Sequence, residues 1–438
     1  MTTTPSSPST RTPDAAAPAP ESTDVLVVGA GPAGSAAAAW AARHGLDVVL
    51  ADSATFPRDK TCGDGLTPRA IAELDRLGLG EWVDRHGRNR GLRAHGFGQT
   101  LELPWPGGSL PAHGSAIPRT ELDDGIRRAA LDAGAVPMDG AKAVGVEFSG
   151  DRVDLVRFAD GRSVRCRRLV VADGARSTLG RELGREWHQD TAYGVAARGY
   201  ITSGRSADPW ISSHLELRGE SDEVLAGYGW LFPLNDGRVN IGVGTLATDR
   251  RPANVRLRSL IELYADARRR DWALDGKVEM VRSALLPMGG AVSGVAGPNW
   301  ALIGDAAGCV NPLNGEGIDY GLETGRLIAD LMASDPGRPL DPAWPAILRS
   351  HYGLAFSIAR RLAGLVTIPS LLPWAGPVGM RSRTLMTVAL RVMGNLVTDS
   401  DRDLTARAWR AAGRLSVRLD ERPPFPASDL RNPVTQPA

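Results

Sequence analysis

Cysteine and histidine are scarce in this chain of 438 residues. Its three cysteines, Cys62, Cys166 and Cys309, lie far apart and form no Cys-x-x-Cys pair. That spacing argues against a disulfide framework and a cysteine zinc site, and it fits a reducing compartment. The seven histidines are scattered, and no two have the spacing of metal ligands. We therefore expect no bound metal.

An excess of charge of one sign and a secretion signal are also lacking. With 51 basic and 50 acidic side chains the net charge is +1, so nothing favours a nucleic-acid partner. Residues 1–23 are rich in Ser, Thr, Pro and Ala and lack the apolar core of a signal peptide. They predict a disordered tail, and a second tail is expected over 421–438. The Gly-x-Ser-x-Gly motif of nucleophilic hydrolases does not occur.

A glycine fingerprint, VVGAGPAG, follows an apolar run over 24–30. Gly29 permits a tight turn, Gly31 lets the backbone approach a pyrophosphate, and Gly34 lets helix and strand pack closely. The predicted helix begins at Pro32 and Ala33, and its first N–H groups and positive dipole end would face the phosphates.

A second strand is predicted over 47–52 and ends on Asp52, 18 residues after Gly34. Its carboxylate is placed to accept hydrogen bonds from an adenosine ribose. Strand, glycine turn, helix and strand together form a βαβ unit and predict a dinucleotide site.

A later glycine-rich segment, GDAAGCVNPLNGEG over 304–317, favours FAD over NAD. Asp305, after Gly304, should reach the ribityl or pyrophosphate part of FAD. A helix predicted to end near Asp330 then opens with four residues whose N–H groups can face the flavin N1–C2=O edge, where negative charge gathers on reduction. These four are Asn314, Gly315, Glu316 and Gly317. In isolation, a left-handed structural turn would explain the glycines equally well.

Two further positions each have two interpretations. Asp173 and Gly174 follow the apolar run LVVA, and they form either an ordinary turn after a strand or a second contact near the cofactor. Arg119 opens a helix predicted over 119–134 and is either a surface side chain or a contact to the flavin or its phosphates.

The order of these patterns predicts an α/β fold with a discontinuous cofactor domain. Strand-like pieces from Tyr193 to Arg282 separate the βαβ unit from a strand, turn and helix at 299–333. We therefore expect a Rossmann-like FAD-binding domain (24–90, 115–185 and 285–340) with an inserted antiparallel β-sheet substrate domain (91–114 and 186–284). A C-terminal helical region is expected over 341–420.

These motifs resemble the geranylgeranyl reductase family. Its members are flavoproteins with a p-hydroxybenzoate-hydroxylase-like fold that saturate isoprenoid double bonds. The resemblance runs from about Asp24 to about residue 420, and within the family the chain looks closest to the menaquinone reductases, which saturate one isoprene unit of the menaquinone tail. It rests on the two glycine segments, on PRDKTCGDGL (57–66), on ADGARS (172–177) and on GYGWLFP (227–233).

The resemblance also implies individual site residues. The family's Cys-Gly-Gly motif falls on Cys62 and Gly63, beside the flavin and the substrate channel. Asp64 stands in place of the second glycine, which changes the backbone freedom and the local charge. Arg58, in the same segment, is assigned to the cofactor.

The family's aromatic substrate motif falls on Tyr228, Trp230, Phe232 and Pro233, although Leu225 replaces its leading proline. In a strand, the three aromatic side chains point to one face and would form an aromatic wall over an apolar tunnel. The same stripe would also suit an ordinary sheet core.

Residues 362–380 carry no charge for 19 residues, as a membrane span would. Pro369, Pro373 and Pro377 argue against a span, because each removes a backbone donor that lipid cannot replace. The flanking arginines, at 360, 361, 381 and 383, suit an interfacial segment or a lid over an apolar tunnel. A buried core segment is the third interpretation. We expect peripheral contact with the cytoplasmic face of the membrane and no transmembrane helix.

The resemblance implies that reduced FAD passes a hydride to an isolated alkene while a proton is added to the other carbon. Tyr228 and Trp230 would line the pocket, and Cys62 is a candidate acid; a packing role for Cys62 and an ordered water as the acid are the alternatives. The expected substrate is menaquinone, with geranylgeranyl diphosphate or another prenyl lipid as alternatives.

The same fold also serves FAD-dependent monooxygenases and halogenases, and a non-catalytic prenyl-lipid-binding flavoprotein is a further alternative. The sequence leaves the electron donor open among NAD(P)H, a ferredoxin-like protein and a deazaflavin.

Overall fold

A computed structural model gives the fold of residues 21–427. The predicted tails therefore lie largely outside the described residues. Ser22 and Thr23, assigned to the first tail, are the first residues of a strand. The prediction of a tail over 421–438 is wrong for residues 421–427. Phe425 is fully buried, and its backbone N–H donates to the Gly290 carbonyl at 2.8 Å. An aromatic residue between prolines has no periodic pattern, so this packing could not be predicted from the sequence.

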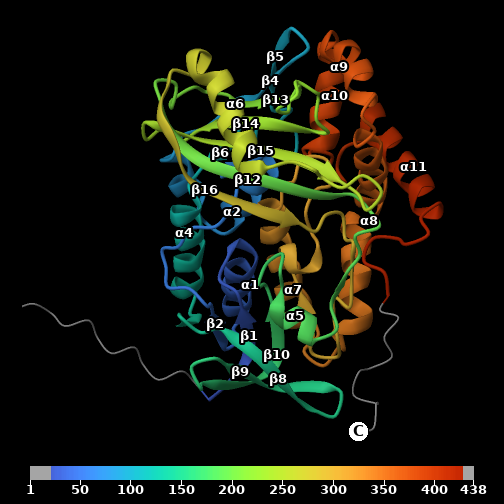
Figure 1. Cartoon of the computed structure of the whole chain (residues 1–438). Helices are drawn as coiled ribbons and strands as arrows, with labels where there is room; N and C mark the ends of the chain where they lie inside the picture. The colour runs from blue at the N-terminus through green and yellow to red at the C-terminus, as the bar shows by residue number, and fades with distance from the viewer. Residues whose placement is uncertain (1–20, 428–438) are drawn as a thin grey trace, which may run out of the picture.

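The lower part of the molecule in Figure 1 is built on one mixed sheet. Its strands, in order across the sheet, are β7 (Val136–Met138), β2 (Val48–Ala51), β1 (Ser22–Val28), β10 (Ser163–Val171), β9 (Arg152–Phe158) and β8 (Ala143–Ser149). β7, β2, β1 and β10 are parallel, and β18 (Trp300–Leu302) pairs in parallel with the end of β10. Residues 25–28 of β1 and all of β2 are apolar and buried, because both faces of the sheet are covered there.

Helices pack on this sheet and on one another. They are α1 (Pro32–Arg43), α2 (Pro68–Arg76), α3 (Gly80–Asp84), α4 (Arg119–Asp132), α5 (Thr178–Glu182), the short 3₁₀ helix η1 (Gly304–Ala307) and α7 (Ile318–Ser334). Helices α1 and α5 contact the strands of the sheet, α4 and α7 pack on α1, and α2 packs on α7. Helix α7 ends four residues later than the predicted end near Asp330, because Leu331 and Met332 remain buried and continue its apolar face.

Helices α1 and α7 approach unusually closely. A Cβ atom at Gly325 would lie 2.6 Å from the Ala33 carbonyl oxygen and 2.8 Å from the Ala37 amide nitrogen. At Gly321 it would lie 3.4 Å from the Cβ of Ala33. Only glycine permits this approach, which brings the start of α7 to the start of α1.

A second sheet lies above the first one in Figure 1. Its strands, in order, are β16 (Leu274–Leu286), β12 (Tyr193–Ser203), β15 (Arg238–Ala247), β14 (Gly227–Pro233), β13 (Ile211–His214), β4 (Gly91–Gly96) and β5 (Gln99–Pro104). All neighbours are antiparallel except β13 and β4, which are parallel. Two small ribbons pair β3 (Gly65–Leu66) with β6 (Ser115–Ala116) and β11 (Glu186–Trp187) with β17 (Val292–Ser293).

The strands of the two sheets lie in the ranges predicted for the two domains, except that β1 begins before residue 24 and β16 ends after residue 284. The domain boundaries themselves stay a prediction. One element in the inserted part was missed: residues expected to be strand-like include helix α6 (Leu257–Trp272). Its buried residues Leu260, Ile261 and Tyr264 have helical spacing and pack on the second sheet.

Four helices follow α7: α8 (Leu340–Val366), α9 (Leu371–Met380), α10 (Arg383–Met393) and α11 (Leu404–Arg418). They run along one side of both sheets (Figure 1). Within residues 21–427 no single helix is long and apolar enough to cross a bilayer, and α8 and α9 reach that length and composition only as a pair bent by 112°.

Helix α9 is half packed and half exposed. Met380 is buried in an apolar cluster that also contains Leu103, Leu390 and, at its edge, Phe97 and Phe232. Trp374 and Val378, in contrast, are 76 % and 61 % exposed. The interpretation of residues 362–380 as a buried core segment is therefore wrong for α9.

The contact between α1 and α7 leads to a stability test. We expect Gly325→Ala to lower the free energy of unfolding by roughly 1–3 kcal/mol, because its Cβ meets backbone atoms of α1 that cannot move independently. Urea denaturation followed by circular dichroism measures the change. The control is Gly364→Ala in α8, where a Cβ meets nothing within 4 Å; it should be neutral or stabilising by up to about 1 kcal/mol. Equal effects of the two changes would contradict the close approach.

Candidate active site

The glycines of the first fingerprint have distinct positions. Gly29 has a φ of 104°, and a Cβ there would lie 2.3 Å from the Ala172 carbonyl oxygen. A Cβ at Gly34 would lie 1.7 Å from the Gly29 carbonyl oxygen. Gly31 instead faces a guanidinium, since its Cβ position lies 3.4 Å from Nη2 of Arg58. Gly29 and Gly34 thus allow the turn itself, while Gly31 leaves room beside a cation.

The N-terminus of α1 follows this turn, with Gly31 as N-cap and Pro32 and Ala33 as its first residues. Asp52 comes directly after β2 and is 7 % exposed. Its Oδ2 accepts a hydrogen bond from the Ala30 amide at 2.7 Å and its Oδ1 from the Ala54 amide at 2.8 Å. Each carboxylate oxygen keeps a second lone pair, so Asp52 both fixes the turn and can accept another hydrogen bond.

Arg58 and Arg119 meet at Asp123, an acid that sequence reasoning missed. Arg119 is the first residue of α4 and binds Asp123 through two hydrogen bonds of 2.6 and 2.8 Å. Nη1 of Arg58 lies 2.8 Å from Oδ2 of the same carboxylate. Arg119 is 3 % exposed, so the interpretation of Arg119 as a surface side chain is wrong. Two cations therefore share one buried carboxylate next to Gly31.

Lys60, which sequence reasoning also missed, links the second glycine segment to this region. Its Nζ lies 3.2 Å from Oδ2 of Asp305 and 3.5 Å from the Cβ position of Gly174. Gly304 has a φ of 56°, and its Cβ position is 2.8 Å from the Cβ of Ala33. Asp305 and the turn at Gly174 thus both lie next to Lys60, close to α1.

Asp173 stands at the end of β10. Its Oδ2 accepts a hydrogen bond from the Leu179 amide at 2.9 Å, while its Oδ1 is buried without a partner among the described residues. Burial raises the pKa of this carboxyl group, and the hydrogen bond from Leu179 only partly opposes that shift.

Helix α7 begins at Ile318 with Gly317 as N-cap. In the preceding turn, Oδ1 of Asn314 accepts from the Glu316 amide at 2.9 Å, and Gly315 has a φ of 75°. Glu316 accepts a hydrogen bond from the Thr67 hydroxyl, and burial followed by the charge of Asp319 raises its pKa. A Cβ at Gly317 would lie 3.1 Å from Oδ1 of Asp305, so all predicted residues of the second segment lie together.

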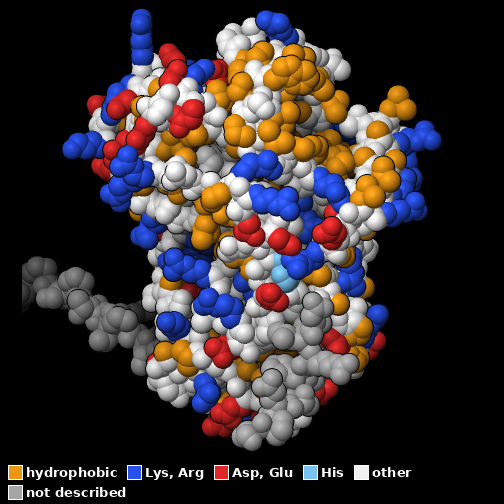
Figure 2. Space-filling view, turned by 45° about the vertical axis from the view of Figure 1, so that its right-hand side comes forward, with side chains coloured by type: hydrophobic (Ala, Val, Ile, Leu, Met, Phe, Trp, Pro, Cys, Tyr) orange, Lys and Arg blue, Asp and Glu red, His pale blue; other side chains and the backbone are white. Residues whose placement is uncertain are grey.

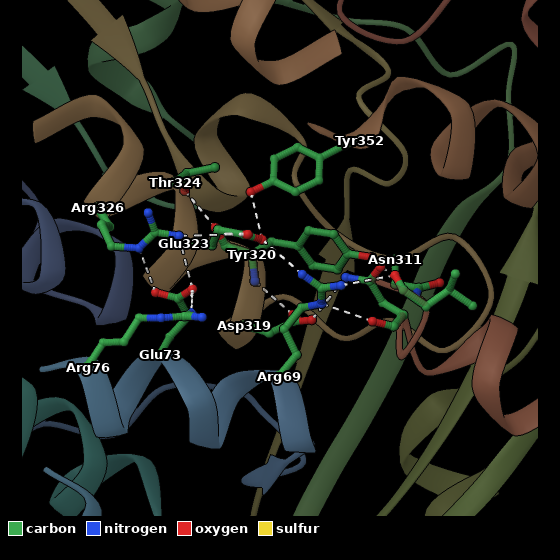
Figure 3. A network of polar contacts seen from close by, with 12 residues as sticks. Arg69, Glu73, Arg76, Asn311, Asp319, Tyr320, Glu323, Thr324, Arg326 and Tyr352 are labelled. Atoms are coloured by element: carbon green, nitrogen blue, oxygen red, sulfur yellow. Dashed lines mark hydrogen bonds and ion pairs between the residues drawn. The ribbon is translucent and has the colours of Figure 1, made fainter. Parts of the chain in front are cut away.

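A buried polar network supports the start of α7 from behind (Figure 3). Arg69 of α2 lies 3.5 Å from Oε2 of Glu323, which also accepts from the Tyr352 hydroxyl at 3.1 Å. Arg326 of α7 binds Glu73 of α2 at 3.0 Å. These pairs join α2, α7 and α8, and sequence reasoning missed them because their partners are distant in the chain.

The three aromatic residues of β14 form one wall, as the alternation predicts. The ring centroids of Tyr228 and Trp230 are 5.8 Å apart, and those of Trp230 and Phe232 are 6.2 Å apart. The Tyr228 hydroxyl donates to the Asn314 carbonyl, which ties the wall to the turn before α7. Pro233 ends the strand and pairs with Val239.

The wall covers the segment that contains Cys62. A Cβ at Gly63 would lie 3.2 Å from Cε2 of Phe232 and 3.3 Å from Nε1 of Trp230. The Cys62 side chain is half-buried and next to Arg119, and burial raises the pKa of its thiol although Arg119 opposes that shift. The aromatic wall, Cys62 and Arg119 are therefore neighbours.

The comparisons agree with this geometry. Residues 22–334 match the family model described as an FAD binding domain. The chain is 64 % identical to a menaquinone reductase of Mycolicibacterium smegmatis over 92 % of this chain and 98 % of that protein. It is 30 % identical to digeranylgeranylglycerophospholipid reductase 1 of Methanopyrus kandleri over 70 % of this chain and 80 % of that protein. Among solved structures, the flavin-dependent brominase Bmp2 superposes with a TM-score of 0.69 at 20 % identity, covering 91 % of this chain and 99 % of that one.

Fold and sequence likeness together define an FAD-dependent oxidoreductase, which confirms the predicted fold class and cofactor. The chain belongs to the geranylgeranyl reductase family of flavoproteins, on the branch of the menaquinone reductases.

The residues present fit FAD. Gly31 leaves space at the N-terminus of α1, Arg58 and Arg119 flank that space with positive charge, and Asp173 has a buried oxygen without a partner among residues 21–427. A helix N-terminus beside guanidinium groups suits a pyrophosphate.

This cradle leads to a binding test. We expect Arg58→Met to weaken FAD binding roughly tenfold to a hundredfold, because a charge-assisted hydrogen bond contributes about 1.5–3 kcal/mol. Flavin fluorescence during titration of the apoprotein measures the dissociation constant. The matched control is Arg88→Met, which removes an exposed arginine paired with Asp84 and should leave the affinity unchanged. Equal affinities of the Arg58 variant and the wild type would exclude Arg58 from the cofactor site.

Proposed function

We propose that this protein is an FAD-dependent reductase that saturates an isolated C=C bond in an isoprenoid chain, most specifically one isoprene unit of the menaquinone tail. The observation that carries the proposal is the aromatic wall of Tyr228, Trp230 and Phe232 packed directly on the Cys62–Gly65 segment. The substrate assignment follows the name of the menaquinone reductase relative.

In this proposal the glycine turn at Gly31, the cations Arg58 and Arg119 and the acids Asp52 and Asp305 hold the cofactor. The turn at 314–317 and Asp173 contact its flavin end, together with Cys62 and Gly63. FAD, once reduced, supplies a hydride; the chain's own residues bind the tail, exclude water and manage the proton.

The wall suits an alkene that is not conjugated to a carbonyl. Hydride addition to such an alkene requires early or simultaneous protonation, so positive charge develops on a tertiary carbon. Aromatic faces stabilise nearby positive charge, and an apolar pocket excludes water that would trap it. Tyr228, Trp230, Phe232 and Pro233 are the proposed substrate contacts, and Cys62 is a proposed catalytic acid.

Turnover tests the proposal directly. The purified protein is reduced chemically under anaerobic conditions, which bypasses the unknown physiological donor, and is then mixed with menaquinone carrying an unsaturated tail. We expect the product to gain two hydrogens that persist after the quinone ring is reoxidised, as read by mass spectrometry. Hydrogens lost on reoxidation would mean reduction of the ring alone.

Two controls give the negative result a meaning. Geranylgeranyl diphosphate replaces menaquinone in one, and air replaces the anaerobic atmosphere in the other. If both lipids stay unsaturated and oxygen is consumed only with some other substrate, the reductase assignment fails in favour of a monooxygenase. Binding of a prenyl lipid without any turnover would instead support a non-catalytic carrier.

We also propose that the exposed apolar face formed by α9 and the adjacent ends of α8 and α10 contacts the cytoplasmic membrane surface. Its exposed residues are Leu362, Leu365, Trp374, Val378 and Leu385. Figure 2 shows hydrophobic side chains gathered on the upper part of the face where α9 and α10 lie. Arg381 and Arg383 at the start of α10 are exposed beside it, as expected for a segment that lies on an anionic lipid surface.

Vesicle binding tests this surface. We expect the double change Trp374→Ser and Val378→Ser to lower the partition onto anionic phospholipid vesicles at least tenfold, because full burial of each side chain contributes about 1.5–3 kcal/mol. Co-sedimentation measures the bound fraction. Leu263→Ser, which removes a 41 % exposed leucine from α6, is the matched control. Unchanged partition of the double variant would remove α9 from the membrane contact.

A further inference from the structure

Asp64 occupies an unusual position between Gly63 and Gly65. Its φ of 63° lies in the left-handed region, which residues other than glycine rarely adopt and which aspartate and asparagine tolerate best. The side chain is fully buried. Burial of a carboxyl group is unfavourable unless hydrogen bonds and charges compensate it, so its contacts indicate what it does.

Those contacts reach the substrate sheet. Oδ2 of Asp64 accepts a hydrogen bond from the Tyr200 hydroxyl and another from Nδ2 of Asn240, both at 2.8 Å. Asn240 in turn donates to the Cys62 carbonyl at 2.9 Å and accepts from Nε1 of Trp230 at 2.9 Å. One carboxylate thus connects the Cys62 segment, through a single asparagine, to the central ring of the aromatic wall.

The same residue stands opposite a cation at the Cys62 thiol. The Asp64 amide donates to Sγ of Cys62 at 3.4 Å, and Arg119 lies close enough to the thiol for its positive charge to lower the pKa of Cys62. A nearby positive charge favours the thiolate and a nearby negative charge favours the thiol. The guanidinium of Arg119 and the carboxylate of Asp64 therefore act on the Cys62 thiol in opposite directions, while the Asp64 amide acts in the same direction as Arg119.

We propose that Asp64 is a positioning residue of this site: held by Tyr200, it fixes Cys62 and Trp230 through Asn240, and its carboxylate opposes the charge of Arg119 at Cys62. This role of Asp64 adds to the proposed function, and the test that measures turnover of a prenyl lipid rests on that function. It assigns a task to the residue that replaces the second glycine of the family's motif.

The charge state of Asp64 sets the pH range of this effect. Burial raises the pKa of Asp64 to about 6, although Asn240, Tyr200, Arg198 and Arg119 all lower it. Arg198 and Tyr200 face it from β12, Arg119 from α4, and Cys62 from its own segment. Because the carboxyl group is ionised above about pH 6, its effect on Cys62 is present at neutral pH and is lost as the pH falls below 6.

Thiol alkylation tests the charge effect without turnover. In Asp64→Asn the side-chain oxygen still accepts from Tyr200 and Asn240, and asparagine tolerates the left-handed backbone, but the negative charge is gone. We expect the pKa of Cys62 to fall, so that the thiolate fraction rises; because a thiolate of lower pKa is less nucleophilic, the net gain in alkylation rate is about threefold. The holoenzyme is treated with iodoacetamide at several values above pH 6, and the modified peptides are quantified by mass spectrometry.

The two other cysteines are internal controls. Cys166 and Cys309 are buried free thiols, and the acids that raise their pKa are Asp154 for the former and Asp305, Glu323 and Asp319 for the latter. Their alkylation should not change in the variant, and faster alkylation of all three would indicate unfolding. A Cys62 rate equal to the wild-type rate, with both controls unchanged, overturns the proposed charge balance.

A second variant isolates the hydrogen bonds. Asp64→Gly suits the backbone angle but removes the acceptor of Tyr200 and Asn240, so we expect the KM for the prenyl lipid to rise about tenfold while Asp64→Asn stays within about threefold of the wild type. A wild-type KM in Asp64→Gly overturns the positioning role. If the wild-type protein itself reduces no prenyl lipid, the proposed function fails, and the alkylation result still decides the role of Asp64 at Cys62.

Discussion

The approach of α7 to α1 is the constraint on which the site depends. Gly321 and Gly325 let backbone meet backbone at Ala33, so two glycine segments separated by more than half of the chain open at one place. The carboxylate of Asp305, the turn at 314–317 and the N-terminus of α1 converge because no side chain separates the two helices. The network of Arg69, Glu323 and Tyr352 then holds the start of α7 from the opposite side.

The sequence revealed the parts of the site that depend on local backbone chemistry. Glycine turns, the acid after β2 and the alternation of Tyr228, Trp230 and Phe232 are legible because each is set within a few residues. The roles of Asp123, Lys60 and Asn240 could not be predicted, because each depends on partners that only folding brings close. Asn240, for example, binds Asp64, which lies 176 positions away in the sequence. Helix α6 was overlooked although its apolar spacing was helical, since its many arginines hid the pattern, and Phe425 gave no pattern to find.

The fold leaves the reaction open, since a flavin-dependent brominase shares it. What differs among such proteins must lie in the side chains that surround the reacting atoms. At the proposed site these side chains come from the loop before β3 and from β14, two segments joined by Asp64 and Asn240. Chemistry in this architecture is therefore adjusted by a few contacts between domains, while the scaffold that grips the cofactor stays the same.

The apolar cluster beneath α9 extends from Met380 to Phe232 at the aromatic wall. If the prenyl tail of the substrate enters from beside α9, it can move from the bilayer into the protein without contact with water. The quantity that governs encounter is then the number of substrate molecules per unit of bilayer area, and adding inert lipid at constant total substrate slows the enzyme by dilution in two dimensions.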